Sequence, residues 1–231
     1  MEKKKRLVVL TGAGISAESG LRTFRDSDGL WEGYNVHEVA TPRGFRANPQ
    51  LVLDFYNMRR KDVAAAQPNA AHIGLAALEE HFDVHIITQN IDDLHERGGS
   101  TQVLHLHGEI FSMRSVLDEH KTYPIRGDIH WGDLAADGGQ LRPHIVWFEE
   151  PVPMIEKAAE IAATADLFAV IGTSLQVYPA AGLLHSVPMD TRVWVIDKKI
   201  PEIVSAHRVM PIETGACEGI ATWTKELLRY R

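Results

Sequence analysis

The sequence predicts an α/β fold built on a doubly wound parallel sheet, and two observations carry this prediction. Short apolar segments with the length of buried strands recur along the chain, and longer stretches of helix-forming residues lie between them. This alternation is typical of parallel strands joined by crossover helices, with helices on both faces of the sheet.

The expected strands are short runs of Val, Ile, Leu or Phe that end at charged residues or glycine. They cover residues 7–10, 84–88, 167–172 and 192–197. The expected helices are rich in Ala, Leu and charged residues, and they cover residues 15–20, 50–66, 69–81 and 155–165. Ser16 is a candidate N-cap for the first of these helices.

Two stretches interrupt this alternation, residues 26–60 and residues 112–144. The first is rich in Gly, Pro and aromatic residues, and the second combines several glycines with many charges. We therefore expect one domain over residues 1–231, a Rossmann-like sheet with a small inserted second lobe. The large lobe would cover approximately residues 1–25, 61–111 and 145–231, and the small lobe approximately 26–60 and 112–144.

Composition and charge limit the classes of protein that need to be considered. Of the 231 residues, 45% are hydrophobic and the formal net charge is −7, which permits a sizeable core and disfavours non-specific nucleic-acid binding. The single cysteine, Cys217, excludes an intramolecular disulfide and a multi-cysteine zinc site. The apolar run after the basic start is too short for a signal peptide, and no stretch approaches a membrane span. We expect a cytoplasmic protein without membrane or nucleic-acid partners; its oligomeric state stays open.

A glycine-rich turn, Gly12-Ala13-Gly14-Ile15-Ser16-Ala17, follows the first expected strand. A plain strand-to-helix turn would give the same pattern. In this context we favour a dinucleotide site, because such glycines let the backbone approach a pyrophosphate closely. The acidic residue expected about 20 positions later at the end of a second strand is missing, since Glu32 lies in a Gly-rich loop. The motif is therefore not that of an ordinary dehydrogenase.

Polar residues also follow two other expected strands, at positions 89–92 and 172–174. Such residues face the ligand crevice of a doubly wound sheet, although 89–92 also suits a helix cap and 172–174 a simple turn. His105 and His107 share one face of a strand, and either could be a general base or a structural histidine. Tyr56 and Arg59 share one helix face, where they could bind a carboxylate or be a core Tyr beside a solvated Arg.

Taken together, these segments resemble the sirtuin family of NAD-dependent protein lysine deacylases. The resemblance covers nearly the whole chain and rests on residues 12–25, 89–92, 107–108 and 172–174, which occur in the family's order. Residues 28–60, with Gly29-Leu30-Trp31 and Phe55-Tyr56-Asn57-Met58-Arg59-Arg60, resemble the bacterial and mitochondrial class that removes succinyl and malonyl groups. The resemblance implies acylated-lysine proteins or peptides as partners.

The resemblance implies a role for each motif residue. His107 and Asn90 would be catalytic. Tyr56 and Arg59 would bind a distal acyl carboxylate, and the peptide would lie between Val146-Trp147-Phe148 and Val177-Tyr178. Residues that would bind NAD are Gly12, Ala13, Gly14, Glu18, Thr23, Phe24, Arg25, Trp31, Gln89, Asn90, Ile91, Asp92, Gly172, Thr173, Ser174, Asp197 and Ala216.

The reaction implied by the resemblance consumes NAD as a co-substrate. Nicotinamide leaves, the acyl oxygen attacks the ribose carbon, and His107 takes a proton from a ribose hydroxyl. That hydroxyl would attack the resulting imidate, and water would then release free lysine and O-acyl-ADP-ribose. A protein mono-ADP-ribosyltransferase and a non-catalytic NAD-binding sensor are the alternatives; His107, Asn90 and the Tyr56/Arg59 pair favour deacylation.

Three departures from the family pattern stand out. Family members usually carry two Cys-x-x-Cys pairs that bind zinc, but residues 112–144 contain no cysteine and Ser115 lies near the first ligand position. We predict no zinc, and a small lobe held by packing through Tyr123, Ile129 and Trp131. The usual Phe-Gly-Glu reads Phe148-Glu149-Glu150, and an Asn that contacts the adenosine ribose is replaced by Asp197.

Overall fold

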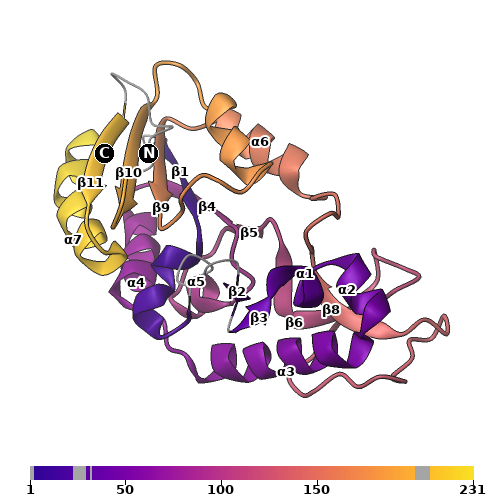
Figure 1. The fold of residues 1–231 in the computed structure, drawn as a ribbon. Helices are drawn as coiled ribbons and strands as arrows, with labels where there is room; N and C mark the ends of the chain where they lie inside the picture. The colour runs from indigo at the N-terminus through magenta and orange to yellow at the C-terminus, as the bar shows by residue number, and fades with distance from the viewer. Residues whose placement is uncertain (1–2, 23–29, 32, 201–208) are drawn as a thin grey trace.

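The structure is a computed structural model that describes residues 3–22, 30–31, 33–200 and 209–231. A six-stranded sheet with the order β11-β10-β9-β1-β4-β5 forms the larger part, and its neighbouring strands are parallel (Figure 1). This confirms the predicted α/β class. The strands are β1 (Arg6–Thr11), β4 (Asp83–Thr88), β5 (Val103–His105), β9 (Leu167–Ile171), β10 (Arg192–Asp197) and β11 (Val209–Glu213).

Helices cover both faces of this sheet. Helices α4 (Ala70–Ala77) and α7 (Ala216–Leu227) lie on one face, and α6 (Ile155–Ala163) with the 3-10 segment η5 (Ala180–His185) lies on the other (Figure 1). Each face of the sheet has its own hydrophobic core. In β1, Leu7 and Val9 belong to the core under α4 and α7, and Val8 and Leu10 belong to the core under α6 and η5. A strand buried on both faces needs apolar residues at successive positions, which explains the apolar runs in the sequence.

A second, smaller unit carries its own sheet and core. Its three-stranded antiparallel sheet has the order β7-β6-β8, and three helices and a two-stranded ribbon pack with it (Figure 1). We propose that this unit is the small lobe, with the approximate boundaries 26–60 and 112–144 predicted from the sequence. The elements are β2 (Leu30–Trp31), β3 (Tyr34–Asn35), α1 (Val36–Val39), α2 (Pro42–Ala47), α3 (Pro49–Ala65), β6 (Gly108–Ser115), β7 (Thr122–Pro124) and β8 (Leu141–Ile145).

Buried polar side chains of α3 tie this smaller unit together. Arg60, 1% exposed, donates from Nε to the Ile110 oxygen at 2.9 Å and from Nη1 to Asn57 Oδ1 at 2.8 Å. Asn57 in turn donates to the Ile129 oxygen and accepts from the Ile129 nitrogen, both at 2.9 Å. Each bond replaces water for a buried polar group, so removing either side chain would leave its partners unsatisfied.

The predicted packing role is wrong for Trp131. Its side chain is 57% exposed, whereas Ile129 is buried in the core of the small unit and Tyr123 is partly buried beneath Lys121. The α3 hydrogen bonds described above supply long-range ties that the apolar pattern could not reveal.

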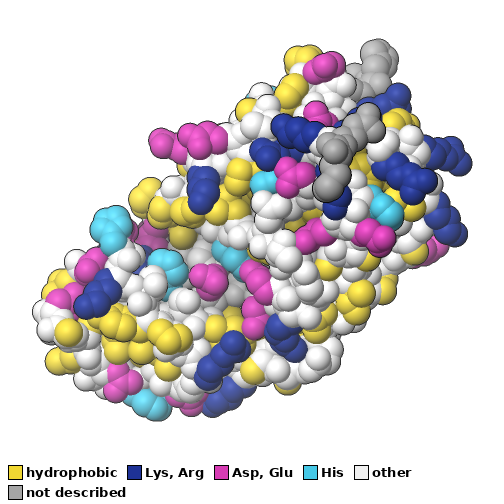
Figure 2. Space-filling view, turned by 180° about the vertical axis from the view of Figure 1, so that it is seen from behind, with side chains coloured by type: hydrophobic (Ala, Val, Ile, Leu, Met, Phe, Trp, Pro, Cys, Tyr) yellow, Lys and Arg dark blue, Asp and Glu magenta, His cyan; other side chains and the backbone are white. Residues whose placement is uncertain are grey.

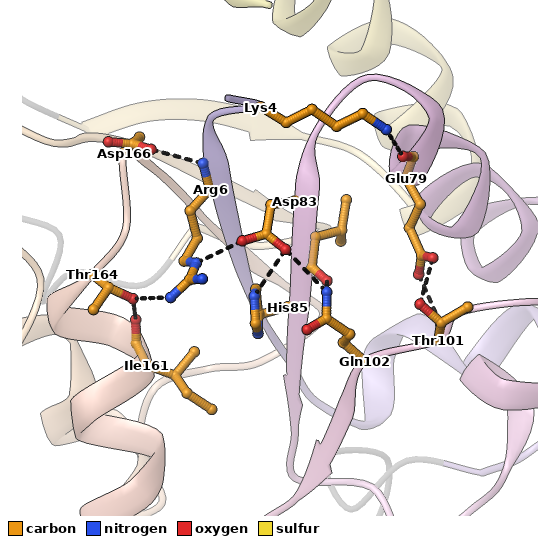
Figure 3. Close-up of polar contacts among 11 residues, drawn as sticks. Lys4, Arg6, Glu79, Asp83, His85, Thr101, Gln102, Ile161, Thr164 and Asp166 are labelled. Carbon is orange, nitrogen blue, oxygen red and sulfur yellow. Dashed lines mark hydrogen bonds and ion pairs between the residues drawn. The ribbon is translucent and has the colours of Figure 1, made fainter. Parts of the chain in front are cut away.

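The amino-terminal edge of the large sheet is closed by a polar network (Figure 3). Asp83 accepts hydrogen bonds from Arg6 Nε at 2.9 Å, His85 Nε2 at 3.1 Å and Gln102 Nε2 at 3.0 Å. Burial raises the pKa of Asp83, but the bonds from Gln102, Arg6 and His85 outweigh it and lower the pKa to about 2. The network therefore joins the starts of β1 and β4.

On the face shown in Figure 2, acidic and basic side chains are intermixed, in keeping with the modest net charge of −7. Among the described residues, no helix has both the length and the apolar character needed to cross a bilayer.

Candidate active site

A cavity of about 440 Å³ opens at the carboxyl edge of the large sheet and extends to the small unit. Ligands of doubly wound sheets bind at this edge. The cavity brings together the following predicted residues, which come from distant parts of the sequence: Gly12, Ala13, Gly14, Trp31, Tyr56, Arg59, Gln89, Asn90, Ile91, Asp92, His107, Val146, Phe148, Gly172, Thr173, Ser174, Val177, Asp197 and Ala216.

The glycine-rich turn after β1 differs from the predicted helix. It forms two 3-10 turns, η1 (Ala13–Ile15) and η2 (Ala17–Ser19), and Ser16 makes no side-chain cap for either. The reason is tertiary: the Gly14 nitrogen donates to the Gly172 oxygen at 2.8 Å, and the Ser16 hydroxyl bonds to residues after β4. These contacts hold the turn against the neighbouring loop and override the local helix pattern.

The loops after β1 and β9 approach each other so closely that side chains would not fit between them. A Cβ on Gly14 would lie 2.7 Å from the Gly172 Cα, and a Cβ on Gly12 would lie 2.7 Å from the Thr173 Cβ. Gly172 itself has φ +64°, which favours glycine. The resulting backbone wall is a shape that suits a pyrophosphate, so the residues present fit a dinucleotide.

Asn90 and Asp92 are joined by the hydroxyl of Ser16. Asn90 Nδ2 donates to Ser16 Oγ at 3.1 Å, and Ser16 Oγ donates to Asp92 Oδ2 at 3.0 Å. The buried side chain of His72 places its Nε2 atom 3.4 Å from the same hydroxyl. Burial lowers the pKa of His72 to about 4. A neutral histidine thus completes the network, and burial raises the pKa of Asp92 despite its bonds to Leu94 and Ser16.

His107 lies beside this network with one ring nitrogen already engaged. Its Nδ1 donates to the Gln89 oxygen at 2.9 Å, because a carbonyl oxygen can only accept. Burial lowers the pKa of His107 below 6.5, and the bond to Gln89 offsets only part of this effect. The ring is therefore neutral near pH 7, with Nε2 as a proton acceptor, the state that a general base needs.

Tyr56 and Arg59 lie on the buried face of α3, and both line the cavity. Their exposures are 1% and 5%, so Arg59 is not a solvated side chain. Arg59 Cζ lies 5.4 Å from the centre of the Trp31 ring, and burial strongly raises the pKa of the Tyr56 hydroxyl. A permanent cation and a protonated phenol thus line one cavity wall.

The segment Phe148-Glu149-Glu150 keeps a glycine-like backbone despite its sequence. Glu149 has φ 73°, a left-handed conformation that costs of order 1 kcal/mol for a residue with a side chain. Its carboxylate pairs with Arg43, with Nη2 and Oε1 2.6 Å apart. Glu150 accepts from Arg142 at 2.7 Å and from the Trp147 nitrogen at 2.8 Å. These contacts of Glu149 and Glu150 hold the segment in this conformation beside the cavity residue Phe148.

Two predicted residues lie away from the cavity wall. Glu18 accepts from the Cys217 nitrogen at 3.0 Å and so joins the turn to the start of α7, and Tyr178 is 66% exposed. Thr23, Phe24 and Arg25 lie outside the described residues. Lining residues to which sequence reasoning gave no site role are Ser16, Ala17, Leu21, Arg22, Ala40, Ile145, Val152, Ile196, Lys198 and Thr214.

The residues at the tip of the small unit do not fit a zinc ion. The only cysteine of the chain is Cys217 in α7, and Ser115 Oγ instead donates to Asp137 Oδ1 at 2.9 Å. The same Asp137 oxygen accepts from the Gly139 nitrogen at 2.9 Å. No group of three or more His, Cys, Asp or Glu in the described ranges is arranged to hold a metal.

The fold and cavity are those of a dinucleotide-binding α/β protein, and similarity to known proteins gives the family. The Sir2 family model matches residues 12–179. The "NAD-dependent protein deacylase" of Helicobacter pylori is 56% identical over 224 residues, which cover 97% of this chain and 98% of that protein.

Two solved structures extend the comparison. The crystal structure of a Sir2 homolog–NAD complex has a TM-score of 0.85 and 36% identity, over 98% of this chain and 89% of that one. A Sir2 protein bound to acetylated peptide has a TM-score of 0.79 and 29% identity, over 96% and 93% of the two chains. The chain belongs to the Sir2 family.

Proposed function

We propose that this Sir2-family chain, an NAD-dependent protein deacylase, removes succinyl and malonyl groups from lysine faster than it removes acetyl groups. The observation that carries the preference is the buried Tyr56–Arg59 pair in the cavity wall. A malonyl or succinyl group ends in a carboxylate, whereas an acetyl group ends in a methyl group.

The buried pair offers a bound carboxylate a positive charge and a hydroxyl donor. Arg59 Nη1 also lies 3.8 Å from Oδ2 of Asp62, whose side chain is 47% exposed. At that distance and exposure this ion pair contributes little. Charge-assisted bonds from a guanidinium and a phenol to a desolvated carboxylate are worth about 1.5–3 kcal/mol each.

The residues of the sheet edge would hold NAD in an extended pose. The backbone of residues 12–14 would bind the pyrophosphate, Thr173, Ser174 and Asp197 the adenosine side, and Asn90 with Asp92 the nicotinamide side. NAD, when bound, supplies a ribose carbon that becomes reactive as nicotinamide leaves. Since an amide oxygen is a poor nucleophile, much of the acceleration must come from fixing it next to that carbon.

His107 would act after the acyl oxygen has bonded to the ribose. Its Nε2 accepts a proton from a ribose hydroxyl, which makes that oxygen nucleophilic toward the acyl carbon. After that oxygen has bonded to the acyl carbon, one water is consumed to break the bond between this carbon and the lysine nitrogen. The proposed products are nicotinamide, free lysine and O-acyl-ADP-ribose. The substrate peptide would add as an extended strand between the segments around Phe148 and Val177, which both line the cavity.

The test is mass spectrometry of three peptides with one sequence, whose central lysine is succinylated, malonylated or acetylated. With NAD present, we expect faster loss of the acidic acyl groups, with one nicotinamide released per lysine freed. Tyr56→Phe should lower kcat/KM for the acidic groups by about ten-fold or more and change the acetyl value little. Equal rates on all three peptides in the wild type would overturn the proposed preference.

A further inference from the structure

A second histidine, His105, lies beside the reaction site with both ring nitrogens engaged. Its Nδ1 lies 2.9 Å from the Asn90 oxygen, and its Nε2 lies 2.8 Å from Glu96 Oε1. The His105 side chain is 10% exposed and that of Glu96 is 41% exposed. The imidazole thus bridges a surface carboxylate and the backbone of a residue in the cavity.

Both partners of His105 are acceptors, and this fixes its protonation. A carbonyl oxygen and a carboxylate each need a hydrogen from the ring, and only the imidazolium carries one on both nitrogens. His107, two residues along, has an acceptor partner at Nδ1 and, among the described residues, none at Nε2. The two histidines therefore differ in charge, with His105 the cation and His107 the neutral base.

The bond to Asn90 acts on the network that was described in the cavity. The Asn90 nitrogen donates to Thr88 Oγ1 at 3.1 Å, and its side chain bonds to Ser16, which in turn bonds to Asp92. The bond from His105 to the Asn90 oxygen holds the peptide group that follows Asn90. His105 thereby limits rotation of the loop that carries Asn90 and Asp92.

The charges around His105 favour the cation. Burial opposes the charge, but the hydrogen bond and charge of Glu96, the Asn90 carbonyl and the charge of Glu109 outweigh it and raise the pKa above 6.5. Burial raises the pKa of Asp92, and the charge of His105 offsets part of this effect. Burial, with the charges of His72 and His105, lowers the pKa of His95 and keeps it neutral. The acidic groups that face His105 are Glu96, Glu109 and Asp92.

We propose that His105 and Glu96 form a positioning pair that holds Asn90 for catalysis only while His105 is charged. When His105 loses its Nε2 proton, a lone pair faces the Glu96 carboxylate, and the bridge opens. Turnover should therefore carry an alkaline limb set by His105. The inference rests on the role proposed above for Asn90, but not on the preference for acidic acyl groups.

Glu96→Gln and His105→Gln test this with opposite pH signatures. The readout is kcat at saturating NAD, relative to the wild type, with the peptide that the wild type cleaves fastest. Glu96→Gln lowers the pKa of His105, so the ratio should be near one at about pH 6 and fall by up to about ten-fold as pH rises. His105→Gln keeps a donor but no charge, so its deficit should be greatest at acidic pH and shrink as the wild type loses its charge.

His85→Gln is the matched control, because His85 also pairs with a carboxylate, Asp83, at 3.1 Å, but at the far edge of the sheet (Figure 3). Its kcat ratio should stay flat. Thermal melting of each variant verifies folding. Flat ratios for both test variants would overturn the pairing role. If the wild type turned over none of the acyl peptides, the proposed function would fail instead.

Discussion

His107 donates a hydrogen bond from Nδ1 to the backbone oxygen of Gln89 at 2.9 Å, and this bond fixes the tautomer of the ring. The proton acceptor of the site is therefore Nε2, on the other side of the imidazole. Gln89 follows β4 and His107 follows β5, so the parallel pairing of these strands positions the base.

The first prediction concerns the acidic limb of turnover. Burial lowers the pKa of His107 below 6.5, so the base should stay neutral through pH 7 and lose activity only below its lowered pKa. We expect kcat/KM to fall about ten-fold per pH unit in that range. His107→Ala should lower kcat by about 10²–10⁴-fold at neutral pH, and this deficit should shrink as the wild type loses activity at acidic pH. A wild-type acidic limb retained by His107→Ala would assign the limb to another group.

The second prediction separates two adjacent arginines. Arg60 donates to Ile110, Asn57 and Gly127, whereas Arg59 lines the cavity. Arg60→Met should lower the free energy of unfolding by about 2 kcal/mol or more, because buried acceptors lose their donor. Arg59→Met should change it much less. Urea denaturation measures both, and equal destabilisation would contradict these separate roles.

The third prediction concerns the tip of the small unit. Ser115→Ala removes the bond to Asp137 and should cost about 1 kcal/mol of unfolding free energy. Chelator treatment should leave the melting temperature and turnover unchanged, because the donor set does not suit zinc. Metal analysis of the purified protein gives an independent check, and stoichiometric zinc would show that the prediction is wrong.

The fourth prediction concerns stability at low pH. The pKa of Asp83 falls from 3.8 to about 2 on folding, so its contribution is complete above pH 3.8 and is lost as pH falls toward 2. Asp83→Asn should therefore destabilise the protein by about 2 kcal/mol or less at neutral pH, and this difference should shrink below about pH 4. Urea midpoints across this range provide the measurement; a difference that grows on acidification would contradict the assignment.

Continuous apolar runs made most of the large sheet predictable, and the missed strands show the limit of that signal. β5 has three residues, and β11 is an edge strand that contains Pro211. An edge strand needs neither burial on both faces nor every backbone donor, so its sequence carries little strand pattern.

The cavity residues were predictable where a motif follows a strand, and less so where tertiary contacts decide. Ser16 fits a helix cap by sequence, but bonds to Asn90 and Asp92 use its hydroxyl. His72 has no local signal, since its buried imidazole occupies an ordinary helix position in the sequence. Arg59 shares the cavity wall with Tyr56 because α3 buries that face, which the i,i+3 spacing had suggested.

The most direct test of the proposed preference is the ratio of kcat/KM for succinyl-lysine to that for acetyl-lysine, measured by competition in one mixture. In the wild type we expect this ratio to exceed one. In Arg59→Met it should fall by about 100-fold, through loss of the succinyl value, because a charge-assisted contact worth about 3 kcal/mol is removed. An equal loss of both activities in Arg59→Met would contradict a carboxylate-binding role for Arg59.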